Sequence, residues 1–157
     1  MTNINKLIQD LTLKEKISLM SGFNSWYTNK IERLGVPSIK MSDGPNGVRG
    51  DSTSGKSSAC FPCAISIGST WDMNLINQLG VALGEEAKVK DVDVLLGPTI
   101  NIHRHPLGGR HFESFSEDPF LTGKIATEYV KGVQSQNVAA CLKHFIGNDT
   151  EYERHLV

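Results

Sequence analysis

The sequence predicts an α/β fold in which parallel strands are joined by helical crossovers. Short apolar segments begin near residues 38, 64, 93 and 138, and segments with a helical spacing of apolar residues separate the later ones. Parallel strands need such crossovers because the end of one strand and the start of the next lie at opposite edges of the sheet. Four strands of this kind would make half of an eight-stranded barrel or a small open sheet.

Length and charge limit the protein class. A chain of 157 residues can bury one hydrophobic core, so residues 1–157 are interpreted as part of one domain. The net charge of -1 leaves no basic surface for nucleic acid or an anionic membrane, and both are excluded as partners. The N-terminus has no basic region followed by an apolar run, and no segment is long enough to cross a bilayer. We therefore expect a cytoplasmic protein.

The first part of the chain is predicted as a helix followed by a strand and a polar loop. Residues 3–21 have a helical pattern, in which Thr12 and Glu15 have the spacing of a capping box. Residues 36–41 are predicted as a weak strand. This strand leads into residues 42–50, where glycine, proline and charged residues indicate a tight loop.

The rest of the chain alternates between strands and helices. Residues 64–67, 93–98 and 138–142 are predicted as strands. Helices are predicted over residues 72–88 and 118–136, each beginning at an aspartate that can cap it. No helix is predicted after the last strand, so we expect a truncated chain. The predicted buried stripes are Leu75, Leu79 and Leu83 in the first helix and Leu121, Ile125, Tyr129 and Val133 in the second.

The chain has three cysteines, Cys60, Cys63 and Cys141. An odd number without an export signal argues against a disulfide framework. Cys60 and Cys63 have the spacing of a redox motif, but such a motif is followed directly by a helix, and a strand is predicted here. We therefore expect buried structural thiols.

Polar clusters follow the ends of three predicted strands, and parallel strands would bring them to one face. Their carboxylate, guanidinium, ammonium and imidazole groups could hold a phosphate or a polyhydroxylated sugar. No glycine-rich turn of the Walker or the dinucleotide kind opens a helix, so a sugar is favoured over a phosphate. The clusters are Asp43 with Arg49, residues 103–111, and Lys143 with His144 and Arg154.

A metal-binding module is the alternative from another functional class. His103, His105 and His111 lie within nine positions, and catalytic zinc commonly takes three protein ligands. Pro106 and the glycines after it leave the directions of these side chains unfixed. Structural loop histidines are therefore favoured, and no metal or cofactor is expected.

Several short motifs occur in order along the chain. They are Ser42 to Arg49, Phe61-Pro62, Ser69 to Asp72, Gly97-Pro98 with Asn101, Arg104 and Pro106, Gly109 to Pro119, Lys143 to Phe145 with Asn148, and Glu153-Arg154. Taken together, these motifs resemble the N-terminal catalytic domain of glycoside hydrolase family 3 β-glucosidases from residue 6 onward. The resemblance implies a partial (β/α)8 TIM-like barrel holding about the first four strands of eight, with the rest of the barrel and a second domain absent. It implies a sugar at the carboxyl ends of the strands.

The resemblance also implies which residues bind the sugar. Asp43 looks like the family's carboxylate that accepts hydrogen bonds from two hydroxyls of the nonreducing glucosyl unit. Arg110, Lys143 and His144 look like the donors to neighbouring hydroxyls. Arg49 and Arg154 together resemble the more peripheral basic residues that position the loops and these ligands.

The reaction centre of the family is missing from this sequence. Hydrolysis with retention needs two carboxyl groups about 5 Å apart, one as nucleophile and one as acid/base. The family's nucleophile lies in a Ser-Asp-Trp type motif on a later strand, and its acid/base lies on a following domain; neither is present. Asp72 and Glu117-Asp118 are interpreted as a helix cap and a loop-and-cap pair. The chain alone is expected to hydrolyse nothing measurable.

Other interpretations stay open at this stage. The chain could be a noncatalytic sugar-binding fragment that acts with a complementary chain, which would also cover an exposed strand edge. β-Xylosidases and N-acetylglucosaminidases of the family share much of the scaffold. The pattern from Lys143 to Asp149, followed by Glu153-Arg154, looks more like the glucosidase type. The substrate is therefore expected to be a β-glucoside or an oligosaccharide.

Overall fold

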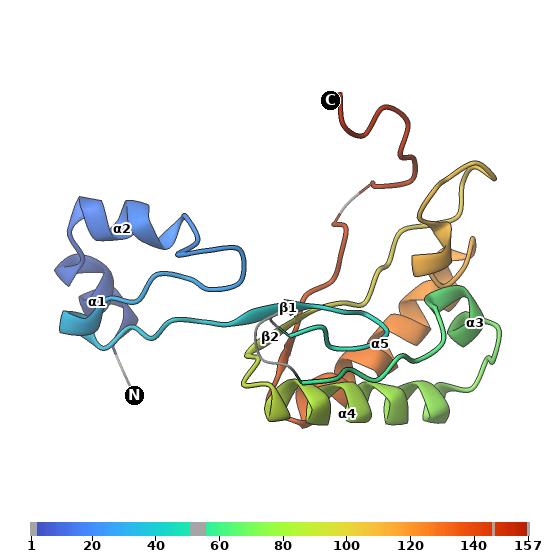
Figure 1. The fold of residues 1–157 in the computed structure, drawn as a ribbon, viewed down its shortest axis with the longest axis horizontal. Helices are drawn as coiled ribbons and strands as arrows, with labels where there is room; N and C mark the ends of the chain where they lie inside the picture. Colours follow the sequence, from blue (N-terminus) through green and yellow to red (C-terminus); the bar gives the residue numbers. More distant parts are fainter. Residues whose placement is uncertain (1–2, 51–55, 146, 157) are drawn as a thin grey trace. The chain divides into compact units, whose positions relative to one another are not determined.

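The structure is a computed structural model that describes residues 3–50, 56–145 and 147–156. The chain divides into two compact units, Met1–Met41 and Ser42–Val157. Figure 1 shows the elements of each unit along the chain.

The first unit contains two short helices where one was predicted. These are α1 (Ile4–Asp10) and α2 (Leu13–Leu19), followed by a 3-10 turn, η1 (Glu32–Leu34). The predicted capping box is confirmed: the Thr12 hydroxyl accepts from the Glu15 amide, and the Glu15 carboxylate accepts from the Thr12 amide. This cap requires an extended backbone at Thr12, so it interrupts the helix.

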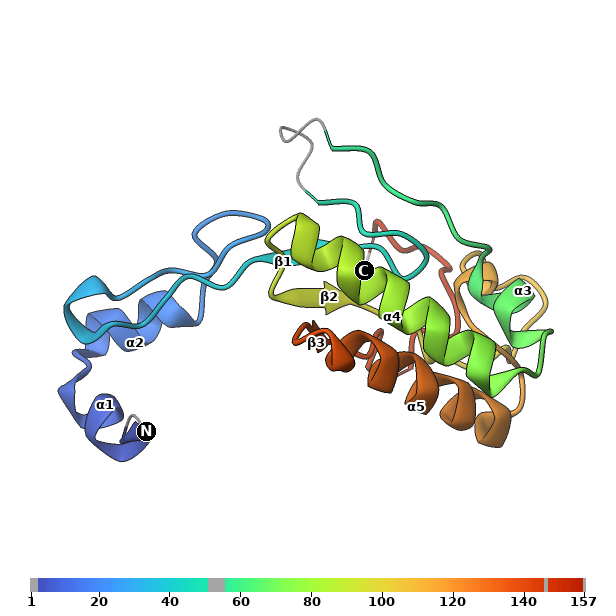
Figure 2. The ribbon, with the colours of Figure 1, turned by 90° about the horizontal axis from the view of Figure 1, so that it is seen from below.

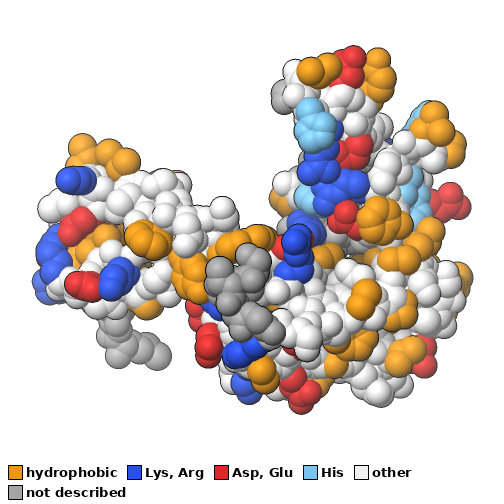
Figure 3. Space-filling model, in the orientation of Figure 1, with side chains coloured by type: hydrophobic (Ala, Val, Ile, Leu, Met, Phe, Trp, Pro, Cys, Tyr) orange, Lys and Arg blue, Asp and Glu red, His pale blue; other side chains and the backbone are white. Residues whose placement is uncertain are grey.

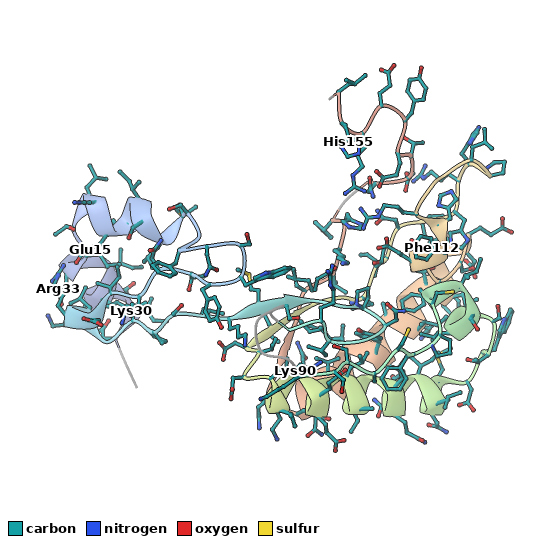
Figure 4. All side chains as sticks on the ribbon, in the orientation of Figure 1. Glu15, Lys30, Arg33, Lys90, Phe112 and His155 are labelled. Carbon is teal, nitrogen blue, oxygen red and sulfur yellow. The ribbon has the colours of Figure 1, made fainter. Side chains whose placement is uncertain are left out.

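A charge pair ties η1 to α2 within the first unit. The Arg33 side chain donates from Nε to Glu15 Oε1 at 2.7 Å, and Figure 4 shows the two residues together. This hydrogen bond, together with those from Thr12, lowers the pKa of Glu15 to about 2.

The second unit contains a small sheet and three helices. The sheet has the order β1 (Met41–Asp43), β2 (Val94–Leu96), β3 (Ala139–Ala140). β2 and β3 are parallel, with Val94 opposite Ala139 and Leu95 opposite Ala140, as predicted for these two strands. The helices α4 (Met73–Val89) and α5 (Pro119–Ser135) lie side by side (Figure 2). The strands are shorter than predicted, and the first begins at Met41 rather than near residue 36.

The predicted strand at residues 64–67 is wrong. This segment forms the short helix α3 (Ala64–Gly68). Ala64 and Ile67 are buried, whereas Ile65 and Ser66 between them are exposed. The burial of Ala64 and Ile67 follows the three-residue spacing of a helix. Four residues are too few for the sequence to distinguish this spacing from the alternation of a strand. The described residues therefore form a sheet of three strands and not four.

The expectation of buried thiols is also wrong. Cys60 and Cys141 are exposed, Cys63 is partly exposed, and all three are unpaired. Cys63 precedes α3 directly, so a helix and not a strand follows the Cys-x-x-Cys pair. For Cys60 and Cys63, the strand that was predicted to follow and bury the segment does not form.

The two long helices begin as predicted. Asp72 accepts from the amides of Asn74 and Leu75, and Asp118 caps α5 in the same way, with proline in its first turn. In α5, Ile125, Tyr129 and Val133 are buried as predicted, and Leu121 is partly buried. In α4 the buried face differs from the predicted one: Leu75, which was predicted to be buried, is 50% exposed. The buried positions of α4 are Ile76, Gly80, Leu83, Gly84 and Ala87.

α4 and α5 are in backbone contact where they cross. A Cβ atom on Gly80 would lie 2.4 Å from the Tyr129 carbonyl oxygen, and one on Gly132 would lie 2.3 Å from the Asn77 carbonyl oxygen. Real Cβ atoms do not approach backbone so closely, so both positions require glycine. The two helices are therefore held at a fixed, short separation.

No helix among the described residues combines the length and the apolar character that a membrane span requires.

Candidate functional site

The ends of the strands bring Asp43 and Lys143 together. Lys143 follows β3 by three residues, and its backbone N–H donates to the Pro98 carbonyl at 3.0 Å, which continues the pairing beyond β2. Its ammonium group donates to Asp43 Oδ1 at 2.6 Å, across 100 positions of sequence. The predicted pair therefore meets at one end of the sheet.

The Asp43 carboxylate is ionised at neutral pH. Burial raises its pKa, but the hydrogen bond from Lys143 and the positive charges of Lys143 and Arg49 outweigh this effect, so the pKa lies below the ordinary value of 3.8. Arg49 itself is exposed, and its backbone N–H donates to the Asp43 carbonyl at 3.0 Å.

Arg110 is held by two glutamates. It immediately precedes η2 (His111–Glu113), and its Nε and Nη2 atoms donate to the two Glu113 oxygens at 2.8 and 2.9 Å. Its Nη1 atom donates to Glu151 at 3.4 Å. Such a bidentate pair fixes the plane of the guanidinium group. Arg154 joins the same cluster through Glu151, at 3.1 Å.

His144 connects Arg110 to Asn101, and its tautomer follows from these contacts. The Asn101 Oδ1 atom accepts from the His144 backbone N–H at 2.9 Å, which fixes the orientation of the amide. The ring Nδ1 atom lies 3.2 Å from the same oxygen, so Nδ1 carries the proton. Nε2 then accepts from Arg110 Nη2 at 2.9 Å. The peptide bond between Lys143 and His144 is cis.

The pKa of His144 is expected to lie below the ordinary histidine value of 6.5. Burial lowers this pKa below 6.5, and the charges of Arg110 and Lys143 lower it further. The stability that the neutral imidazole contributes is therefore complete above pH 6.5 and is lost as the pH falls through the lower, folded-state value. An NMR titration of the ring should give a midpoint below 6.5, and Arg110→Met should raise it. A wild-type midpoint at or above 6.5 would contradict this assignment.

Three of the six predicted residues line one open hollow. Arg110, His144 and Arg154 surround a hollow of about 600 Å³, together with Phe145, Asn148 and Glu151. Charged and histidine side chains gather on this side of the second unit (Figure 3). Asp43, Lys143 and Arg49 are not in its wall. Lys143 is joined to it through its neighbour His144.

Sequence reasoning did not assign roles to three residues that organise this cluster. Glu113 follows Arg110 by three positions, a spacing that could have indicated the ion pair. Asn101 belongs to the recognised motifs, but its contact with His144 spans 43 positions. Glu151 precedes Arg154 by the same three-residue spacing, but its contact with Arg110 spans 41 positions and carries no such signal.

The histidines that suggested a metal module make backbone contacts. His103 Nε2 lies 2.8 Å from the His111 carbonyl and 3.0 Å from that of Ser114. His111 Nε2 lies 2.6 Å from the His105 carbonyl. Within the described ranges, the side chains form no group of three or more that could hold a metal ion.

Comparison with known proteins identifies the family. The model of the glycosyl hydrolase family 3 N-terminal domain matches residues 4–157. The chain belongs to glycosyl hydrolase family 3. The resemblance inferred from the motifs is thereby confirmed, and the relatives are named β-glucosidases, so this is a family of enzymes.

Relatives and solved structures cover nearly all of this family 3 chain. It is 56% identical to a β-glucosidase of Rhizobium radiobacter over 153 residues, which are 96% of this chain and 19% of the relative. A probable β-glucosidase I of Emericella nidulans is 54% identical, over 97% of this chain and 18% of its own. The chain thus spans about a fifth of the length of the curated relatives it matches.

The solved structures agree with the α/β fold. A Kluyveromyces marxianus β-glucosidase in complex with glucose has a TM-score of 0.91 and 46% identity, over 96% of this chain and 18% of its own. A Thermotoga neapolitana β-glucosidase 3B, also in complex with glucose, has a TM-score of 0.85 and 40% identity, over 94% of this chain and 24% of its own. These similarities confirm an α/β fold with a small parallel sheet.

Proposed function

We propose that this chain is the glucosyl-binding half of a retaining β-glucosidase that removes terminal nonreducing β-D-glucosyl residues. The observation that carries the proposal is a polar network in which the consecutive residues Lys143 and His144 contact Asp43 and Arg110, respectively. The relatives that share this segment are named β-glucosidases, and two of the similar structures hold glucose.

The network has the chemistry to bind a pyranose. Asp43 uses one carboxylate oxygen for Lys143, which leaves the other oxygen as an acceptor for a sugar hydroxyl. Lys143 and Arg110 supply charge-assisted donors to neighbouring hydroxyls. His144, protonated at Nδ1, uses its Nε2 lone pair to accept from Arg110, so in this tautomer it would orient Arg110 and not donate to a hydroxyl itself. Arg49 and Arg154 act at the periphery.

The carboxylates of this network are engaged with cationic side chains. Asp43 pairs with Lys143, Glu113 with Arg110, and Glu151 with both Arg110 and Arg154. Hydrogen bonds and nearby positive charges lower the pKa of Asp43 and of Glu151, whereas an acid catalyst must be protonated at working pH, so neither suits the acid/base role. Asp72 and Asp118 are engaged as helix caps. Because the family's nucleophile and acid/base motifs are missing from this sequence, we expect both groups to come from outside this segment.

The remaining barrel strands would be added beside β3. In the order β1-β2-β3, β3 is an edge strand of the described sheet. A largely apolar groove of about 570 Å³ runs along α5, lined by residues such as Ala126, Val130 and Leu142. Exposed apolar surface of this kind favours a covering element. We propose that residues 1–157 are the N-terminal part of a (β/α)8 barrel domain, completed by a longer or a complementary chain.

The chain alone is expected to release no measurable p-nitrophenol from p-nitrophenyl β-D-glucoside, because it lacks the two catalytic carboxyl groups. The full-length Rhizobium radiobacter relative serves as the positive control. Saturation-transfer NMR should detect glucose binding by the same preparation. Xylose, which lacks the hydroxymethyl group of glucose, should bind more weakly if the site contacts that group. Robust turnover would overturn the predicted inactivity, and absence of glucose binding would overturn the proposed site.

A further inference from the structure

The loop that carries Asp43 is held by a neighbouring segment. This loop, residues 43–50, turns tightly at Gly44 and Gly47. The Asn46 carbonyl accepts from the Phe61 backbone N–H at 2.8 Å, and its side chain donates back to the Phe61 carbonyl at 3.2 Å. A Cβ atom at Gly47 would lie 2.0 Å from the Ala59 carbonyl oxygen. The two segments are therefore in backbone contact.

A carboxylate from α4 joins the same two segments. Glu86 Oε2 accepts from the Val48 backbone N–H at 3.1 Å, and Glu86 Oε1 accepts from the Ala59 backbone N–H at 2.9 Å. Val48 is completely buried. One side chain thus satisfies a buried amide in the Asp43 loop and an amide in the segment beside it. This arrangement uses both oxygens of an ionised carboxylate.

Lys90 completes the arrangement one turn further along, beside the C-terminal end of α4 (Figure 4). Its ammonium group donates to Glu86 Oε1 at 2.8 Å and to Ser58 Oγ at 2.6 Å, and also to the Val48 carbonyl. Lys90 is only 4% exposed. Both backbone groups of Val48 are therefore bound by an ion pair from the helix.

A buried ion pair contributes little net stability, because desolvation offsets the attraction between the charges. Its directional hydrogen bonds can nevertheless hold a loop in one arrangement, as a binding site requires. We infer that Glu86 and Lys90 are positioning residues, which fix the loop so that the Asp43 carboxylate is preorganised for a glucosyl hydroxyl. This inference rests on the proposed function.

The test compares Glu86→Gln with Glu85→Gln in the 157-residue chain. Glutamine keeps the shape of Glu86, but it turns an NH2 group toward one of the two backbone N–H groups. Glu85 is the exposed neighbour on the same helix and provides the matched control. We expect E86Q to weaken glucose binding about 10-fold and to speed amide exchange at Val48 and Ala59 about 10-fold, whereas E85Q changes neither.

Ser58→Ala provides a milder second variant, since Ser58 is exposed and E86Q could fail to fold. It removes the hydroxyl that accepts from Lys90 and donates to the Val48 carbonyl at 2.6 Å. We expect about 3-fold weaker glucose binding. Folded variants with lowered stability but wild-type glucose affinity would overturn the positioning role, and so would unchanged exchange at Val48. If wild type binds no glucose, the proposed function fails, while amide exchange still decides whether Glu86 fixes the loop.

Discussion

Asp43→Asn should weaken glucose binding by the 157-residue chain about 100-fold, the largest effect expected from a single substitution in the site. Hydrogen bonds to an ionised carboxylate contribute roughly 1.5–3 kcal/mol each, and a loss of about 3 kcal/mol corresponds to about 100-fold in affinity. The asparagine also leaves the Lys143 ammonium, now 2.6 Å from an Asp43 oxygen, without its counter-charge. Affinity is measured by NMR titration with glucose.

Asp91→Asn is the matched control for this substitution. Asp91 is exposed, and asparagine tolerates its backbone φ of 55°. The affinity of the D91N variant for glucose should equal that of the wild type. If D43N bound glucose as tightly as D91N, the carboxylate of Asp43 would have no part in sugar recognition, and the interpretation of the network as a sugar site would be wrong.

Gly132→Ala should lower the free energy of unfolding by about 3 kcal/mol. The new methyl group would lie 2.3 Å from the Asn77 carbonyl oxygen and 2.8 Å from the Gly80 Cα atom. These are backbone atoms of α4, so the helices must separate, and such overpacking typically costs roughly 1–3 kcal/mol. Urea denaturation followed by circular dichroism measures the change.

Gly123→Ala separates this clash from the effect of helix propensity. Gly123 lies on the same helix, is exposed, and has no atom within 4 Å of an added Cβ. Alanine in a helix is favoured over glycine by roughly 1 kcal/mol, so G123A should be slightly more stable than wild type. Equal stabilisation by both substitutions would show that α4 and α5 are not in backbone contact at Gly132.

Features encoded locally could be predicted from the sequence. Thr12 with Glu15, Asp72, and Asp118 with Pro119 form their caps within three or four residues, so the chain itself carries the signal. The pairing of β2 with β3 followed from two apolar runs separated by a long helix. The prediction for Ala64–Gly68 was wrong because five residues do not define a period. The packing of Ala64 and Ile67 into the core determined the helix.

The site could be predicted in its residue types but not in its internal geometry. The position of each polar cluster after a strand indicated that Asp43 and Lys143 would meet. The protonation of His144 at Nδ1 depends on its contact with Asn101. The position of Arg110 between two glutamates depends on its contact with Glu151. Both contacts span more than 40 positions, so each is a product of the folded chain.

The glycine crossing of α4 and α5 has a consequence for the position of the Asp43 loop. Tyr129, three residues before Gly132, donates its hydroxyl to the Pro45 carbonyl at 2.9 Å, while Glu86, six residues after Gly80, holds Val48. The two hydrogen bonds that hold the Asp43 loop thus come from α5 and α4. The separation of these helices is set by Gly80 and Gly132. Substitutions in this interior, away from the Asp43 carboxylate itself, are therefore expected to shift the Asp43 loop.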